Sequence, residues 1–283
     1  MELVLKAINE HEELNAIWEG CNIMAVKRLG MSDHGKTHVT IVANLAVKIL
    51  RTLVETGVTP SIVEDWEFES DDAEIVVLLA SLMHDLGNSV HRALHGDIGV
   101  ALAVKILPEV LEAAYPDTRS RQIIIMETLH AMVAHDTEVA VYTIEAGVVR
   151  VADGLDMKKG RARIGFESGK KDIHSISAMA IEDVRLLKPT DEKPVRVEIV
   201  MEDAAGVFQV DYLLKKKIKG SGLEPYVEIV AKISKDAGLE HPIETYRIGW
   251  LFILLKSRLN IPCCCSGFFS SAGCGFFASA PPC

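Results

Sequence analysis

Apolar residues recur every three or four positions through much of the first half of the chain. The clearest stripe covers residues 37–55, and a more uniformly apolar run covers residues 73–83. This spacing predicts helices, the first buried along one side and the second buried all round. Gly87 and Asn88 then predict a bend. Further helical patterns lie at residues 96–115, 120–135 and 143–157. We therefore expect residues 1–165 to be helical throughout.

The pattern changes after residue 165. Residues 175–187 still favour a helix, whereas residues 194–202 and 225–234 alternate between apolar and polar positions as strands do. A helical pattern at residues 209–220 separates the two predicted strands. The predicted fold class is therefore mainly α, a helical bundle followed by a small C-terminal α/β (β-α-β) appendage.

We divide the chain into a helical domain at residues 1–165, an appendage at 166–258 and a tail at 259–283. The tail has no charged residue, holds five of the six cysteines, and shows neither a helical nor a strand period. Its cysteine spacing matches no paired zinc-binding motif, and no histidine follows it. We expect the tail to be disordered or non-native, and it carries no part of the functional argument.

The charge balance limits the partners. The chain has 30 Lys and Arg against 40 Asp and Glu, a formal net charge of −10. This argues against nucleic acid or an anionic membrane as a partner, so an anionic ligand must meet a local basic cluster. The longest apolar run, at residues 248–255, is too short to span a membrane, and the N-terminus does not resemble a signal peptide. These features predict a cytoplasmic protein.

Histidines are concentrated in the helical part, where eight of the ten occur within the first 135 residues. His38 opens a predicted helix, the pair His84-Asp85 closes the buried one, and Asp153 lies in the last. Histidine and aspartate delivered by separate buried helices form a mixed nitrogen and oxygen site for a divalent metal, with positions left open for water.

Three segments carry a family resemblance: SDHGKTHVTIVANLAVKIL, LLASLMHDLGNSVHRALHGDIG and VVRVADGLDM. Their order, H then HD then D, resembles the HD-domain superfamily of metal-dependent phosphohydrolases, of the archaeal type, over residues 32–163. The resemblance implies an all-helical domain and one or two divalent ions, with Mn, Fe, Co, Ni and Mg all open. The metal ligands that it implies are His38, His84, Asp85 and Asp153, with His95 and His135 for a second ion.

Other histidines compete for these roles. His34 precedes His38 by four residues and His91 precedes His95 by four, while His130 lies five before His135. Residues four apart share one face of a helix, so both members of such a pair could reach one site. We assign His34, His91 and His130 to supporting or acid–base roles.

The resemblance also implies a mechanism in which a metal-activated water attacks phosphorus and Asp85 orients that water. His91 is our first choice to protonate the leaving oxygen, with His130 as another catalytic candidate. A basic cluster next to the predicted metal site would bind the anionic substrate. Its members are Arg92, Lys158, Lys159, Arg161 and Arg163.

The expected substrate is a small phosphate ester, such as a nucleotide, cleaved as a monoester or a diester. Asn88 stands after HDLG, where several branches of the family carry Lys or His, so no particular nucleotide is implied. Two other functions stay open: a di-iron oxygenase on the same fold, and a non-catalytic nucleotide sensor whose appendage signals to a partner. The oligomeric state is also open, with a homo-oligomer as one option.

Overall fold

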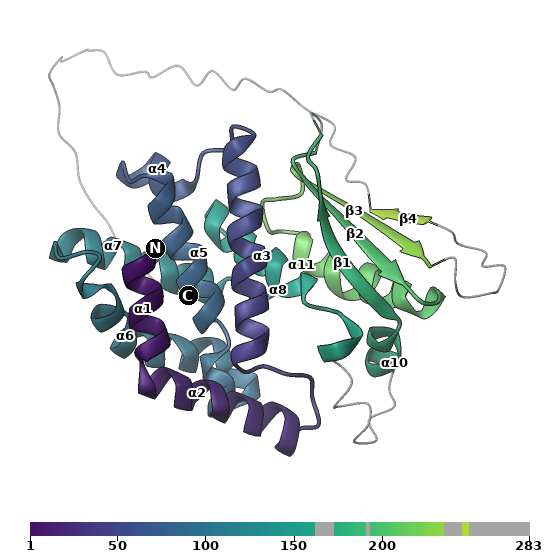
Figure 1. Cartoon of the computed structure of the whole chain (residues 1–283), viewed down its shortest axis with the longest axis horizontal. Coiled ribbons are helices and arrows are strands. Elements are labelled where there is room, and N and C mark those ends of the chain that lie inside the picture. Colours follow the sequence, from purple (N-terminus) through teal and green to yellow (C-terminus); the bar gives the residue numbers. More distant parts are fainter. Residues whose placement is uncertain (162–172, 191–192, 235–244, 249–283) are drawn as a thin grey trace, which may run out of the picture. The chain divides into compact units, whose positions relative to one another are not determined.

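The structure is a computed structural model of the 283-residue chain. It describes residues 1–161, 173–190, 193–234 and 245–248 (Figure 1). The predicted domain boundary at residue 165 and the predicted tail at 259–283 both lie outside the described residues.

Helices account for all the regular structure that is described as far as Arg161, which confirms the helical prediction for that part. The α-helices are α1 (Glu2–Glu10), α2 (Glu12–Asn22), α3 (Lys36–Glu55), α4 (Ser61–Trp66), α5 (Ser70–Met83), α6 (His95–Glu112), α7 (Thr118–Val133) and α8 (Ile144–Leu155). A π-helical turn, η1 (Ile23–Arg28), follows α2, and two 3-10 turns, η2 (Leu86–Ser89) and η3 (Arg92–Leu94), separate α5 from α6.

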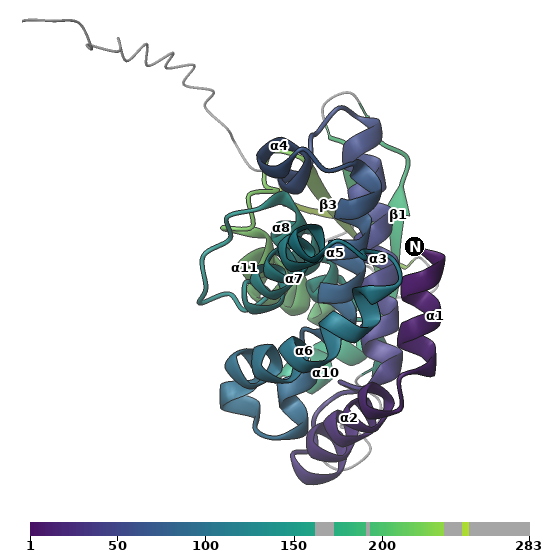
Figure 2. The same ribbon diagram turned by 90° about the vertical axis from the view of Figure 1, so that its left-hand side faces the viewer.

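Helix α5 forms the centre of the bundle and contacts α3, α7 and α8 (Figure 2). Its residues from Ile75 to Met83 are all buried, as expected for a helix apolar on every side. A capping box begins it, in which Glu69 and Asp72 each accept from the other's backbone N–H. The buried position of α5 carries its C-terminal end, and the His84-Asp85 pair, into the interior.

Helix α3 lies beside α5 and α8 with one face buried, including Val42, Ala46 and Leu50. Among the described residues it is also the one helix with the length and composition of a membrane span. The core helix of a soluble domain meets the same criterion, and 44% of the apolar window of α3 is buried inside this fold.

The second part of the chain contains a four-stranded sheet in the order β1-β2-β3-β4. The strands are β1 (Ile181–Leu187), β2 (Val195–Met201), β3 (Val227–Ile233) and β4 (Thr245–Ile248). The predicted β-α-β unit is present, because β2 and β3 are parallel and the helical segments η5 (Gln209–Leu214) and α11 (Lys215–Ile218) connect them. The outer pairs, β1 with β2 and β3 with β4, are antiparallel.

One helix prediction in this part is wrong. Residues 175–187 were expected to be helical, but helix α10 (Ile173–Met179) ends before strand β1 begins at Ile181. Strand β1 pairs along β2 in antiparallel register, with Leu186 opposite Val197. Tertiary pairing with an exposed sheet edge here overrides the local helical pattern. The same kind of pairing, with β3, makes β4 a strand.

The sheet and the helices share one apolar core. Strand β2 alternates between buried and partly exposed residues, and its buried positions join Val210, Leu214 and Ile218 on the connecting segment. Two glycines on α8 let this segment approach closely. A Cβ atom on Gly147 would lie 2.2 Å from the carbonyl oxygen of Ser221, and one on Gly154 would lie 3.1 Å from Leu214. Because the two glycines are seven residues apart, they lie on one helix face.

Candidate metal centre

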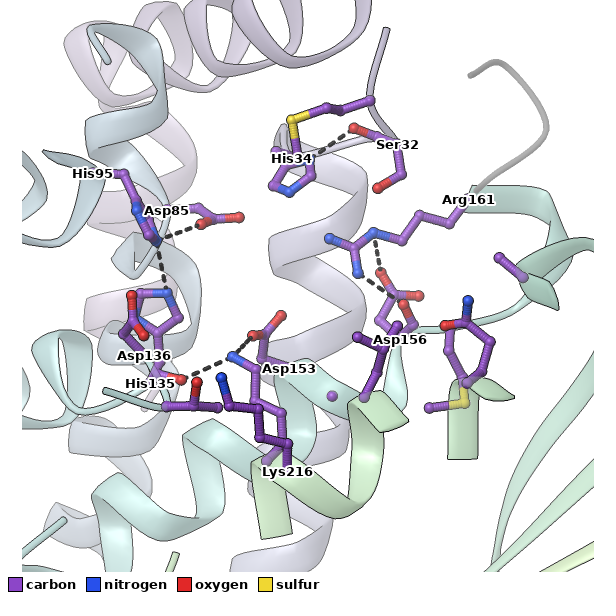
Figure 3. Close-up of a pocket in the computed structure, with 18 of the residues that line it drawn as sticks. Ser32, His34, Asp85, His95, His135, Asp136, Asp153, Asp156, Arg161 and Lys216 are labelled. Atoms are coloured by element: carbon purple, nitrogen blue, oxygen red, sulfur yellow. Dashed lines mark hydrogen bonds and ion pairs between the residues drawn. The ribbon is translucent and has the colours of Figure 1, made fainter. Parts of the chain in front are cut away.

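Six histidine and aspartate side chains converge where the ends of five helices meet. His38 lies in the first turn of α3, and His84 and Asp85 follow the last turn of α5. The other three are His95 at the start of α6, His135 just after α7 and Asp153 near the end of α8. All are buried except Asp153, which is partly exposed to a cavity (Figure 3). These are the six ligands that the sequence predicts.

Four of these side chains form a first group. The Nε2 atom of His38 lies 3.3 Å from Nε2 of His84, 3.5 Å from Oδ2 of Asp85 and 3.4 Å from Oδ1 of Asp153. The Nε2 atom of His84 lies 3.4 Å from Oδ2 of Asp85 and 3.7 Å from Oδ1 of Asp153. Ligands bound at about 2.1 Å around one ion are separated by about 3.0–3.5 Å, so the four atoms suit one divalent metal.

A second group lies beside the first. The Nε2 atoms of His95 and His135 are 3.1 Å apart, and Oδ1 of Asp85 lies 3.9 Å from Nε2 of His95. The two carboxylate oxygens of Asp85 therefore face different groups, Oδ2 the first and Oδ1 the second. A carboxylate placed in this way would be able to supply one oxygen to each of two divalent ions.

Hydrogen bonds fix the ring orientation of the ligand histidines. The Nδ1 atoms of His84, His95 and His135 each donate to the carbonyl oxygen of the residue three positions earlier. A carbonyl can only accept, so the neutral ring keeps an unprotonated Nε2 atom. Two such acceptors, in His95 and His135, face each other at 3.1 Å, where their lone pairs repel unless a cation lies between them.

The charge states also suit a metal. Burial raises the pKa of a carboxyl group, but nearby cationic and histidine side chains outweigh burial here and hold the pKa of Asp85 and of Asp153 well below the usual range. Burial lowers the pKa of His135 to about 3 and also lowers the pKa of His95. The site therefore offers ionised carboxylates from Asp85 and Asp153 and neutral imidazoles from His95 and His135, the forms that bind divalent ions.

A close backbone approach brings the second group to the first. A Cβ atom on Gly87 would lie 2.0 Å from the carbonyl oxygen of His95. Glycine at this position lets the first turn of α6 lie directly against the η2 turn, and so places His95 next to Asp85. The sequence predicts a bend at Gly87. In the structure the role of this glycine is to permit the close contact between η2 and α6.

Asp156 is a functional candidate that the sequence reasoning missed. Its Oδ2 atom lies 2.6 Å from Nδ1 of His38, at the far side of the ring from the metal-facing Nε2 atom. Carboxylates in this position orient a ligand histidine and raise its basicity, and their loss commonly costs 10- to 100-fold in metal affinity. The signal was present in the sequence, as the second aspartate of ADGLDM.

Asp156→Asn is expected to weaken divalent metal binding by about tenfold or more, because the neutral amide no longer supports the His38 ring. Competition against a fluorescent chelator measures this affinity. Asp65→Asn, at an exposed position on α4, provides the matched control and should bind metal as the wild type does. Equal affinity in both variants would remove Asp156 from the site.

Metal binding is expected to tighten as the pH rises. In the metal-free protein burial alone would lower the pKa of His38, but hydrogen bonds to Asp153, Asp156 and Asp85 together raise it from 6.5 to about 10. A metal must displace this proton, so the affinity should rise by up to about tenfold per pH unit between pH 7 and 9. Calorimetry in buffers of different ionisation enthalpy counts the released protons; an affinity independent of pH would contradict the assignment.

The raised pKa of His38 also makes the stability of the metal-free protein depend on pH. Protonated His38 stabilises the metal-free fold fully below its unfolded pKa of 6.5, and this contribution is lost as the pH rises towards 10.

A cavity of about 600 Å³ opens onto the two groups, and it is lined from both parts of the chain. Of the predicted substrate-binding residues, Arg92, Lys158 and Arg161 line it. Lys159 is not among the lining residues and pairs instead with Glu202, and Arg163 lies outside the described residues. The appendage adds Lys216 and Lys217, which are not among the predicted substrate-binding residues.

Of the three histidines expected in supporting or acid–base roles, only His34 lines the cavity. His34 lines the cavity, and its Nδ1 atom lies 2.7 Å from the carbonyl oxygen of Ser32. His91 is exposed and accepts from the backbone N–H of Ala93, and His130 stacks on Tyr142. Neither His91 nor His130 lines the cavity, so the proposal below does not use them as catalytic residues.

Comparison with known proteins agrees with the motif and the geometry. The sequence pattern of the HD domain matches residues 35–158, a span that contains all six candidate ligands. The uncharacterized protein MJ1020 of Methanocaldococcus jannaschii is 41% identical over 235 residues, which cover 83% of this chain and 90% of that protein. No solved structure matches significantly. The chain belongs to the HD-domain family, and the similarity to MJ1020 extends beyond the HD domain into the appendage.

Proposed function

We propose that this protein is a metal-dependent phosphohydrolase that cleaves a small phosphate ester, such as a nucleotide. One observation carries the proposal: the two oxygens of Asp85 face two neighbouring groups of histidine nitrogens, at the end of a cavity whose lining includes five cationic side chains. A phosphate ester needs both features, since its reacting phosphorus is surrounded by charged oxygens.

The donor set fits one or two divalent transition ions. His38, His84, Asp85 and Asp153 would hold the first, and Asp85, His95 and His135 the second. When bound, such ions supply Lewis acidity, which lowers the pKa of coordinated water and stabilises charge on phosphoryl oxygens.

Arg161 is the best-placed residue to bind a phosphoryl oxygen. Its Nε and Nη1 atoms donate to the carbonyl oxygens of Asp33 and Asp156, at 3.1 and 2.8 Å. These bonds hold the guanidinium at the cavity wall, where Nη2 lies 3.3 Å from Nε2 of His38. A guanidinium fixed in advance loses little entropy when it binds an oxyanion. Arg92 lies at the edge of the same cavity, with a side chain that is 42% exposed.

His34 is placed to accept a proton or a hydrogen bond inside the cavity (Figure 3). Burial lowers its pKa to about 4, so the ring is neutral near pH 7. Because its Nδ1 atom donates to Ser32, its Nε2 atom is the acceptor. We assign His34 to orient the attacking water or a substrate hydroxyl, a different role from the leaving-group protonation expected of His91.

The protein as a whole is acidic, with a formal net charge of −10, whereas the cavity is lined by five cationic side chains and four aspartates, of which Asp85 and Asp153 are candidate metal ligands. This contrast supports a small anionic substrate rather than nucleic acid. We extend the proposal to a cytoplasmic enzyme that acts on either a phosphomonoester or a phosphodiester.

Turnover assays test the proposal directly. Protein loaded in turn with Mn²⁺, Co²⁺, Ni²⁺, Fe²⁺ and Mg²⁺ is assayed with p-nitrophenyl phosphate, bis-p-nitrophenyl phosphate and a panel of nucleotides. We expect hydrolysis that requires metal and prefers one ester class. Stoichiometric metal without hydrolysis of any of these esters would contradict the proposal.

A di-iron oxygenase is the second candidate, and the completeness of the second group favours it. That chemistry needs two fully ligated ions, and His95 and His135 lie where a second ion would bind. Oxygen consumption by the Fe²⁺-loaded protein in the presence of candidate organic phosphates would distinguish it from hydrolysis.

A further inference from the structure

The appendage contributes a lysine to the metal centre. Lys217 belongs to α11, between strands β2 and β3, yet its Nζ atom lies 2.6 Å from Oδ2 of Asp153. The same Nζ atom donates to the carbonyl oxygen of His135 at 2.8 Å. Lys217 thus contacts one ligand from each group, although it is 64 residues away from Asp153 in the sequence.

The two oxygens of Asp153 have different partners. Oδ1 lies 3.4 Å from Nε2 of His38 and 3.7 Å from Nε2 of His84, which is the metal-facing side. Oδ2 accepts the hydrogen bond from Lys217. A carboxylate oxygen bound to an ammonium group at this distance is a poor second ligand for the same ion, because the two cations repel.

The packing of the appendage holds Lys217 in this position. Helices α8 and α11 are in contact, and the Cβ and Cγ atoms of Lys217 lie 3.2 Å from where a Cβ atom of Gly154 would be. Its side chain is only 22% exposed. The neighbouring Leu214 and Ile218 are fully buried, so the short helix cannot rotate without exposing apolar surface.

We propose that Lys217 is a positioning residue of the metal centre: it restricts Asp153 to a single ligand oxygen and so leaves a coordination position for water or substrate. The appendage is then part of the active site rather than a separate accessory. This inference rests on the proposed metal site, but it concerns how the metal is bound and does not depend on which ester is cleaved.

Removing the lysine has two expected effects. Without the ammonium group both oxygens of Asp153 can bind the metal, and the nearest repulsive charge is lost, so affinity should rise. The extra ligand fills a position that the reaction needs, so turnover should fall. A residue that merely supported the fold would instead lower affinity and turnover together.

The test compares Lys217→Met, Lys217→Arg and Lys219→Met with the wild type, all as full-length protein loaded with Co²⁺. Methionine keeps the stem that packs against Gly154, arginine keeps the charge, and Lys219 is exposed and does not line the cavity. Calorimetry gives the Co²⁺ affinity. The visible absorption of Co²⁺ reports its coordination number, since its bands weaken as ligands are added.

For Lys217→Met we expect Co²⁺ binding about threefold or more tighter, weaker visible bands, and a kcat lower by about 100-fold for any ester the wild type cleaves. Lys217→Arg should retain wild-type affinity within about threefold, as should Lys219→Met. Weaker Co²⁺ binding in Lys217→Met, or an unchanged spectrum, would overturn the proposal. The binding and spectral results decide it even if no phosphate ester is hydrolysed, so its failure is distinct from that of the proposed function.

Discussion

Replacing Asp85 by alanine is expected to weaken divalent metal binding by about 1000-fold and to reduce phosphate-ester turnover below detection. Asp85 has one oxygen facing each group, so its loss affects both candidate ions at once. It also leaves His38 and His84 without the carboxylate that lies 3.5 and 3.4 Å from their Nε2 atoms. Elemental mass spectrometry of the purified variant, with calorimetry for the affinity, measures the first effect.

Asp85→Asn separates the loss of the ligand from damage to the fold. The side-chain amide of Asn88 donates to Oδ1 of Asp85 at 2.7 Å, and an asparagine at position 85 can still accept this bond. Circular dichroism and thermal unfolding should therefore show a folded protein that has lost metal and activity. Metal content equal to that of the wild type in both variants would contradict the assignment of this site.

Local motifs made the ligands predictable. His84 and Asp85 end an apolar helix, and such a helix must be buried, so its C-terminal end had to lie in the interior. His38 lies on α3, which buries one face against that helix, and Asp153 lies near the end of α8, which also contacts it and is buried at every residue from Glu145 to Ala152. Pattern and burial together predict that these residues lie in the interior, and the resemblance to the HD-domain superfamily implies that they share one site.

The residues that support the ligands were not predictable in this way. Lys217 reaches Asp153 only because β2, α11 and β3 fold back onto α8, which no local pattern encodes. Its run of lysines has the composition of an ordinary solvated helix end. Asp156 is visible in the sequence as a second aspartate, but its hydrogen bond to His38 depends on a side-chain direction that the sequence does not specify.

Spacing alone does not show which of the acid–base candidates reach the cavity. His91 and His95 are four residues apart, which would place them on one helix face. The structure instead has the η3 turn between them, and α6 begins at His95, so the two side chains have different surroundings. His34, which lies before α3 rather than on it, reaches the cavity through a bend in the chain at Asp33 to Gly35.

Arg150→Met is expected to lower the free energy of unfolding by about 3–5 kcal/mol, the largest stability effect predicted for any single substitution here. The side chain of Arg150 is 2% exposed and binds carbonyl oxygens. It donates to Ala134 at 2.6 Å, to Asp136 at 2.7 Å, to Gly220 at 3.3 Å and also to Val139. Methionine fills similar volume but leaves these buried acceptors without donors.

The Arg150→Met substitution is also expected to weaken metal binding. Three of these carbonyls belong to the loop after α7 that contains His135, and the fourth, at Gly220, follows the helix that carries Lys217. Arg150 thus connects the second ligand group to the appendage. Urea and thermal unfolding of metal-free protein measure the stability, with an expected fall in Tm of about 10 °C.

Arg51→Met is the matched control. Arg51 forms a two-point ion pair with Glu74, with both N–O distances at 2.7 Å, yet its side chain is 56% exposed. Solvent-exposed pairs contribute about 1 kcal/mol or less, so this change should barely move Tm. Equal losses in the two variants would mean that burial of the Arg150 guanidinium adds nothing to its hydrogen bonds. A large loss of stability in Arg150→Met alone would show that buried hydrogen bonds to neutral carbonyl groups stabilise this fold more than an exposed ion pair does.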